Sequence, residues 1–360
     1  MIVALIRRLL LIFISLVILS ILAYAIMLKD PLNQVLFEGS TFQGYLQYIE
    51  KLTNADFGIT YIGGELLRDQ ILSVLPSTLE LCIAAMILAL LFGIPLGFIG
   101  ALSNHSVGKF IRGFSSIGLS IPVYWIGLIL LYLAAIYNWE ISSVGQYNAL
   151  YEIKPVTGFA IIDVWFVEEP YRIKIVQSVL QHLALPTLVL MIMPMMEITR
   201  LTQHRAEQVI SANYTKTALT RGWSKFKILR VYLLRNTLAP ILPYIIRTFT
   251  LTLAACMLIE NIFNWSGIGQ WLIAALSEQD YNAVASGVIV IGIIVLFINL
   301  LADLSEFLLD PFKKRLGMIE QRAEDFRNTK AKKPFGKYSA KIVLLYLVYS
   351  VFPDWSLLLF

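Results

Sequence analysis

The 360-residue chain has few charged residues and very few cysteines and histidines. Charged residues make up 15% of it, and there are two cysteines and three histidines. A soluble domain is about one quarter charged and about half apolar. Here the apolar share is 58% and the mean hydropathy is +0.72. These values exclude an ordinary soluble domain and indicate that much apolar surface faces lipid.

Motifs for catalysis or metal binding are missing as well. The Gly-Lys pair of a nucleotide-binding P-loop would need Ser or Thr after it, but Phe110 follows Lys109, so we expect no bound ATP. The histidines lack the spacing of a zinc site, and Cys82 and Cys256 lie inside apolar runs, which is typical of buried small side chains. We therefore predict no catalytic residue, no cofactor and no metal, and a protein that is not an enzyme.

Apolar runs long enough to cross a bilayer occur six times. About 20 apolar residues are needed for one crossing. The first run is too long for a signal peptide and has no clean cleavage site, so we expect it to be retained. The sequence predicts an all-α polytopic membrane protein with six transmembrane helices, at residues 9–28, 78–102, 114–137, 182–201, 241–263 and 284–304.

The distribution of lysine and arginine predicts the orientation in the membrane. The net charge is +5, but the basic residues cluster between apolar runs, which argues against a nucleic-acid partner. One side carries fifteen of them, from Arg7 to Arg315, and the other side carries six. Because positive loops stay inside, we predict a cytoplasmic N-terminus and outward segments at 29–77, 139–181 and 264–283. Trp265 and Trp271 are expected to anchor the last of these at the interface.

Five ionisable residues lie within the runs or at their edges. Charges at membrane depth are costly and often functional. Arg247 lies deepest in its run, which makes it the candidate for a water-lined translocation path. For the other four we expect snorkelling or pairing between helices; they are Glu80, Glu197, Glu260 and Asp303.

The basic stretch 200–240 is long for a simple connection between two spans. Residues 200–219 contain no proline or glycine, which predicts one helix. Gly222 then interrupts the pattern, and Ser224 can cap a second helix. A helix, a turn and a second helix at the cytoplasmic face favour docking against another protein.

This stretch resembles the EAA-type loop of transmembrane subunits in bacterial ABC importers, in the oligopeptide/dipeptide form. In that family, a helix of the loop seats in a cleft of the ATPase subunit. Lys216, Thr217, Ala218 and Gly222 stand where the E-A-A-x-x-x-G core would be, so the glutamate is absent. The resemblance implies an ATPase-coupling site formed by Tyr214, Lys216, Thr217, Ala218, Arg221, Gly222, Asn236 and Pro240.

Further motifs extend the resemblance over residues 1–318. They include DFGITY, LPSTLEL, GIPLG and SIPVYWIGL, and later NIFNWSGIGQWLIAAL. The insert at 150–166 is similar to that of Sap-type permeases, which are associated with antimicrobial-peptide resistance. Within the chain we expect an N-terminal helix and periplasmic segment at 1–70, a permease core at 71–305 with the coupling loop at 200–240, and a linker with an apolar tail at 306–360.

The resemblance implies a type I ABC importer permease in a bacterial inner membrane, working by alternating access. Its implied partners are a homologous second permease, two ATP-hydrolysing subunits, a periplasmic binding protein and a peptide substrate. Polyamine or haem as substrate, and export in place of import, stay open. An ion-driven secondary transporter is the alternative class, although it would need buried ionisable pairs near the midplane. For the tail after Gly317 we predict no role in transport; a seventh span is the alternative.

Overall fold

The structure is a computed structural model that describes residues 2–36, 41–61, 63–103, 105–139, 144–148, 150–151, 153–167 and 171–309. The chain divides into two compact units, and the described residues belong to the unit Ile2–Asp310. The tail predictions therefore lie outside the described residues. Within the described ranges the secondary structure is helical, apart from one isolated bridge between Ile59 and Leu66. The all-α prediction is confirmed.

Five helices are long and apolar enough to cross a membrane. They are α1 (Ile2–Met27), α4 (Leu67–Leu102), α8 (Arg172–Ser211), α11 (Leu234–Ile262) and α13 (Tyr281–Leu309). A sixth span is obtained by counting α5 (His105–Ser120) and α6 (Val123–Ile136) as one crossing bent by 89°. The predicted span over 114–137 is interrupted at Pro122, because proline lacks an N–H and disfavours helical geometry in the residue before it, so α5 ends at Ser120 and α6 begins at Val123.

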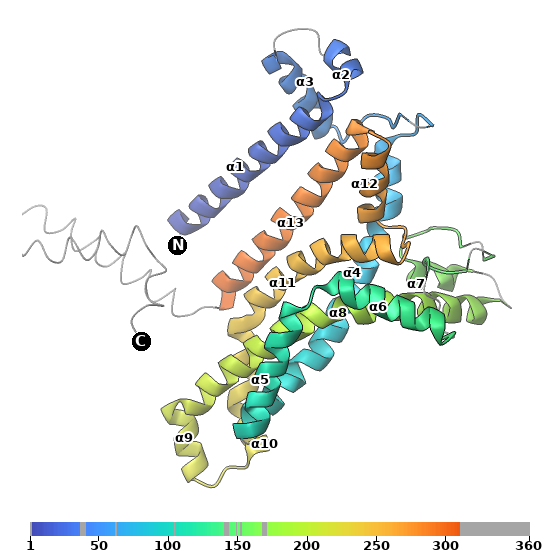
Figure 1. Ribbon diagram of the computed structural model, residues 1–360. Coiled ribbons are helices and arrows are strands. Elements are labelled where there is room, and N and C mark those ends of the chain that lie inside the picture. Colours follow the sequence, from blue (N-terminus) through green and yellow to red (C-terminus); the bar gives the residue numbers. More distant parts are fainter. Residues whose placement is uncertain are drawn as a thin grey trace, which may run out of the picture. The chain divides into compact units, whose positions relative to one another are not determined.

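The shorter elements gather at the two ends of these spans (Figure 1). Near the first turns of α4 and α8 lie α7 (Ala160–Asp163), the 3₁₀ turn η1 (Val164–Phe166) and α12 (Ile268–Ser277). Two further short helices, α2 (Pro31–Leu36) and α3 (Thr41–Thr53), follow α1. At the opposite end lie α9 (Asn213–Thr220), α10 (Lys225–Ile228) and the π-helical turn η2 (Leu229–Leu233).

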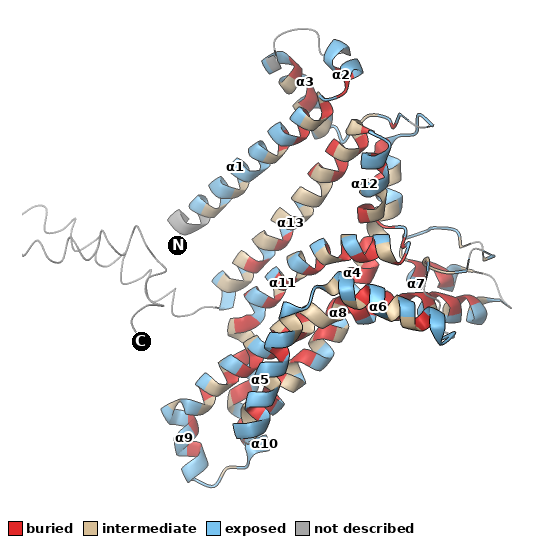
Figure 2. Ribbon diagram, in the orientation of Figure 1, coloured by how far each residue is buried: buried red, intermediate tan, exposed pale blue. Residues whose placement is uncertain are grey.

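The centre of the unit is the packing of α4 against α8 and α11. Buried residues concentrate where these helices meet, whereas α1 stays largely exposed, as a lipid-facing helix would (Figure 2). Gly93 and Gly97 let the backbones of α4 and α8 approach: a Cβ added at Gly97 would lie 2.5 Å from Thr202 Cβ and 2.8 Å from the Thr199 carbonyl oxygen. Glycines spaced four apart serve this purpose in membrane helices.

Two buried carboxylates hold the ends of short helices. Glu80 on α4 accepts hydrogen bonds from the backbone N–H groups of Ala160 (3.2 Å) and Ile161 (2.7 Å) at the start of α7. Glu260 on α11 accepts from the N–H of Gly269 at 2.7 Å, at the start of α12. The expectation of snorkelling or pairing between helices is wrong for these two residues, because each is buried and bonded to backbone donors.

The two tryptophans of the segment 264–283 have different surroundings. Trp265 is fully buried and its Nε1 donates to the Ser77 carbonyl oxygen at 3.1 Å. The Nε1 of Trp271 donates to Gln70 Oε1 at 3.1 Å. The anchoring prediction is wrong for Trp265, because its indole joins the end of α11 to α4 inside the protein.

Candidate functional site

The predicted docking segment forms a compact helical arm, residues 212–233, between α8 and α11. The predicted single helix over 200–219 is wrong: α8 ends at Ser211, because Ala212 adopts an extended backbone with ψ of 145°, and α9 starts after it. The buried Thr215 hydroxyl donates to the Val209 carbonyl oxygen at 2.7 Å. This bond fixes α9 against the end of α8, so the arm leaves the span at a defined angle.

Gly222 ends α9, as the sequence pattern predicts. Its φ is +79°, in the left-handed region that glycine adopts without strain. The Gly222 N–H donates to the Leu219 carbonyl oxygen at 3.0 Å, and the Trp223 N–H donates to that of Ala218 at 3.2 Å. These two bonds form a Schellman motif, which satisfies the last carbonyl groups of a helix. The turn is therefore a fixed corner.

The second helix of the arm begins at the predicted cap. The Ser224 hydroxyl accepts from the Lys227 N–H at 3.3 Å, and α10 follows for one turn. The chain then passes through η2, where the helix widens to π-helical geometry, and continues into α11. The sequence pattern did not indicate this change of helix type. Ile228 and Leu233 are buried against Phe98 and Val209, so the base of the arm belongs to the core of the spans.

Aromatic rings support the inner side of the arm. Trp223 stacks on Tyr232, with ring centroids 5.6 Å apart, and the Tyr214 ring centroid lies 5.4 Å from that of Tyr232. The Lys227 ammonium lies 4.2 Å from the centre of the Trp223 ring, within the range of a cation–π contact. The arm is thereby braced across its turn, which suits an element that transmits movement.

The structure brings most of the predicted coupling residues to one place. Lys216, Thr217, Arg221 and Gly222 are exposed on α9 or at its end, whereas Ala218 is buried beneath them. The remaining predicted residues divide between the arm and α11: Tyr214 is exposed on α9, and Asn236 and Pro240 lie on α11 beyond η2. The exposed basic and hydroxyl groups leave one face of α9 open to a partner.

Arg247 takes part in an ion-pair network that joins three spans. Its guanidinium lies 2.8 Å from Asp303 and 3.4 Å from Glu306, both on α13. Arg8 on α1 shares the same two acids, at 3.5 and 3.4 Å. The pairing expected for Asp303 is thus found. Arg247 is 44% exposed, and no contact in the described part of the chain assigns it to a translocation path.

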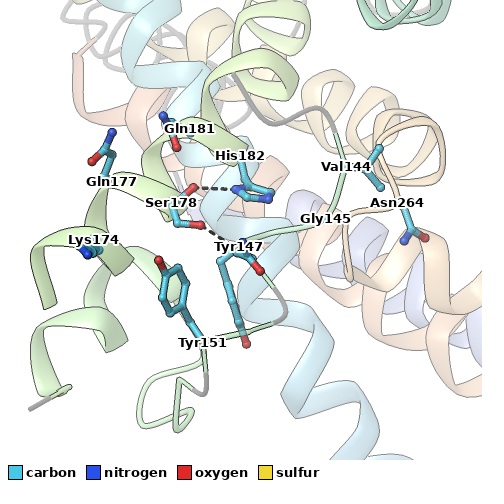
Figure 3. Close-up of a pocket in the computed structure, with 11 residues that line it drawn as sticks. Val144, Gly145, Tyr147, Tyr151, Lys174, Gln177, Ser178, Gln181, His182 and Asn264 are labelled. Carbon is cyan, nitrogen blue, oxygen red and sulfur yellow. Dashed lines mark hydrogen bonds between the residues drawn. The ribbon is translucent and has the colours of Figure 1, made fainter. Parts of the chain in front are cut away.

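A polar pocket of about 730 Å³ lies at the other end of the spans (Figure 3). Its floor is one face of α8, where polar side chains recur three or four residues apart, and its other wall is the loop 144–151. Sequence reasoning missed this site, although the spacing on α8 is a readable signal. Six of the lining residues are Tyr147, Asn148, Tyr151, Lys174, Gln177 and Gln181.

The loop beyond the pocket is organised around Asp163. This buried carboxylate accepts hydrogen bonds from the N–H groups of Val156 (3.2 Å), Thr157 (2.8 Å) and Gly158 (2.9 Å), and from the Thr157 hydroxyl (2.6 Å). Burial alone would raise the pKa of Asp163, but these hydrogen bonds outweigh it, and the pKa lies below its ordinary value. Together with Glu80, Asp163 holds residues 153–163 in one conformation.

The arrangement of spans, arm and external loops defines a class of membrane protein. Residues 93–315 match the family of binding-protein-dependent transport system inner membrane components. The chain belongs to this family. It is a multi-pass inner membrane permease subunit of an ABC transporter and not itself an enzyme, since the ATPase is on separate subunits.

Three permease proteins are similar to this chain over most of its length. The chain is 52% identical over 310 residues to the peptide transport system permease protein SapB of Haemophilus influenzae. This alignment covers 86% of this chain and 97% of the relative. It is 36% identical over 317 residues to the putrescine export system permease protein SapB of Escherichia coli K12, with 88% and 98% covered. The di/tripeptide transport system permease protein DppB of Pseudomonas aeruginosa is 34% identical, with 78% and 83% covered.

Proposed function

We propose that this chain is the permease subunit of an ATP-driven peptide importer, and that its arm at 212–233 receives the ATPase movement. The observation that carries the coupling role is the exposed face of α9, ended by a fixed turn at Gly222. The names of the Haemophilus and Pseudomonas relatives support peptides as the substrate class. The name of one Escherichia relative makes putrescine export the competing possibility.

The proposed assembly contains this chain, a homologous second permease, two ATPase subunits and a periplasmic binding protein. The N-terminus and the arm would face the cytoplasm, and the loops around α7 and α12 would face the periplasm. ATP-driven closure of the ATPase dimer would move α9 as a rigid lever. Because the base of the arm packs on α4 and α8, that movement would pass directly into the two central spans.

Reconstitution tests the substrate and direction. The complete transporter in proteoliposomes, with its binding protein, would receive an equimolar pool of tripeptides on the binding-protein side. We expect ATP-dependent accumulation of tripeptides, measured by mass spectrometry, and no ATP-dependent movement of putrescine in either direction. Putrescine movement without peptide uptake would overturn the proposal and support the polyamine alternative.

Substitution of Gly222 tests the coupling role. In Gly222→Val, a β-branched side chain at φ +79° costs about 1–2 kcal/mol, although a Cβ there would meet no atom within 4 Å. The backbone must therefore turn differently, and we expect ATPase stimulation by substrate-loaded binding protein to fall several-fold while the protein stays in the membrane. Gly222→Asn should retain stimulation, since asparagine tolerates this conformation.

Gly113→Val is the matched control. Gly113 lies on α5, its φ is not positive, and a Cβ there also meets open space, so valine should leave stimulation unchanged. Equal stimulation in Gly222→Val and the wild type would show that the turn is an ordinary connection with no part in coupling.

A further inference from the structure

We propose that the pocket between α8 and the loop 144–151 binds a peptide substrate by its C-terminal carboxylate, with Lys174 as the residue that receives it. This inference rests on the proposed function, because it names a binding site for the same substrate class. It concerns the end of the spans opposite the arm, where α7 and α12 also lie. The permease would then select cargo itself, in addition to the binding protein.

The pocket has walls that the fold holds in place. The Asn148 N–H donates to the Ser178 hydroxyl at 3.0 Å, which ties the loop to α8. The Gly145 N–H donates to the Phe263 carbonyl oxygen at 2.9 Å, which ties it to the end of α11. On the floor, the His182 ring Nδ1 is bonded to the Ser178 carbonyl oxygen at 2.7 Å. Figure 3 shows Gly145, Ser178 and His182 among the residues that line the pocket. A pre-formed pocket loses less freedom when it binds a ligand.

The charge of the pocket favours an anionic group. Lys174 is exposed at the rim, and within the described part of the chain no carboxylate pairs with it. Among the described residues that line the pocket, none is an aspartate or a glutamate. A lysine ammonium binds carboxylates through charge-assisted hydrogen bonds, which are about twice as strong as neutral ones. Among the described lining residues a putrescine ammonium would find no carboxylate, whereas a peptide carboxylate would find Lys174.

The remaining polar groups suit a peptide main chain. Gln177 and Gln181 lie four residues apart on the same face of α8 as Lys174, and their side chains make no hydrogen bond to the described residues. An amide side chain donates and accepts at once, as a peptide group does. Tyr147 and Tyr151 add hydroxyl groups from the facing loop. A volume of about 730 Å³ is within the usual range of small-molecule sites.

A competition assay tests the role of Lys174. The reconstituted transporter would receive an equimolar mixture of a tripeptide pool and the same pool amidated at the C-terminus. The measured quantity is the ratio of free-acid uptake to amide uptake. Any preference of the binding protein affects this ratio equally in all variants. We expect Lys174→Ala to lower this ratio about tenfold and Lys174→Arg to keep it near the wild-type value. Lys154→Ala, at an exposed lysine in the loop beyond the pocket, should leave it unchanged.

The possible outcomes separate the two proposals. An unchanged ratio in Lys174→Ala, whether total uptake falls or not, would overturn the carboxylate site and leave the proposed importer intact. Absence of ATP-dependent uptake of either pool by the wild-type transporter would instead overturn the proposed function. A ratio that is lowered in Lys174→Ala and kept in Lys174→Arg would support the site. A merely structural lysine would affect acids and amides alike.

Discussion

Asp163 shows how a single side chain can organise an external loop. Its carboxylate accepts four hydrogen bonds from Val156, Thr157 and Gly158, three of them from backbone N–H groups. A buried backbone donor that loses its acceptor costs roughly 1–3 kcal/mol. The conformation of residues 153–163 therefore depends on the ionised state of this residue and on its two acceptor oxygens.

The variant Asp163→Asn should loosen this loop. Asparagine keeps one acceptor oxygen but presents an NH₂ group to donors, so we expect local protection to fall by roughly 1–3 kcal/mol, or about 5- to 150-fold in exchange rate. Hydrogen exchange with mass spectrometry on a peptide covering 153–167 measures the change. Asp69→Asn, at an exposed aspartate on α4, is the control and should leave exchange unchanged. Equal protection in both variants would contradict the role given to Asp163.

The pH dependence follows from the lowered pKa of Asp163. A carboxyl group whose pKa is lower in the folded state stabilises that state above its unfolded pKa of about 3.9. The contribution is lost as the pH falls through the folded pKa. We expect loop protection, corrected for the intrinsic exchange rate, to be constant between about pH 5 and pH 7 and to drop below about pH 4. A loss already complete near pH 6 would point to another titrating group.

At the scale of elements, the contact between α4 and α8 depends on small residues. Gly97→Leu should force these helices apart, because the Thr199 carbonyl oxygen belongs to a helix backbone and cannot yield. We expect the free energy of unfolding to fall by about 1–3 kcal/mol. The melting temperature in detergent, measured by thermal aggregation, should be lower by several degrees. Gly113→Leu, where a Cβ meets open space, should melt near the wild-type temperature. Equal melting of the two variants would contradict the close packing.

Local patterns predicted most of the helices but underestimated their lengths. Hydropathy predicted 182–201 as a span, whereas α8 runs over Arg172–Ser211, because its polar ends lie outside the apolar stretch that the pattern detects. The turn at Gly222 and the cap at Ser224 were predicted correctly, since both depend on neighbouring residues alone. The size of the bend at Pro122, which is 89°, could not be predicted because the apolar run continues through it.

Contacts between distant residues could not be derived from the pattern. Trp265 is buried because it reaches Ser77, which is 188 residues away in the sequence. The polar pocket forms where α8 meets the loop 144–151 and Asn264. The coupling residues were located by resemblance, and their roles stay predictions, as does that of Arg247.

At the scale of the whole molecule, cysteine labelling tests the orientation. The native Cys82 and Cys256 are fully buried and should not react, so single added cysteines report cleanly. With the N-terminus inside, Thr220→Cys on α9 should react with a membrane-impermeant maleimide only after the cells are permeabilised. Ser277→Cys on α12 should react in intact cells, since both positions are exposed in the structure. Labelling of position 220 in intact cells would overturn the predicted orientation.

The tail is tested by truncation. The family match ends at residue 315, and the tail lies outside the described residues. We expect a chain that stops after Gly317 to assemble with its partner permease and to transport peptides at the full-length rate, measured by co-purification and uptake. Loss of the partner permease on purification would show that the tail contributes to assembly.

The long separation between α1 and α13 has a consequence for synthesis in the cell. In the described unit α1 packs mainly on α13, and Arg8 donates to the Asp303 carbonyl oxygen across 295 residues of sequence. Because ribosomes add about 5–20 residues per second, α1 would wait roughly 15–60 s for its partner helix to be made. During that interval α1 has lost no lipid contact to α13, so its own affinity for lipid is the main force that retains it in the bilayer. Accordingly, its mean hydropathy of 2.9 is the highest of the five long helices.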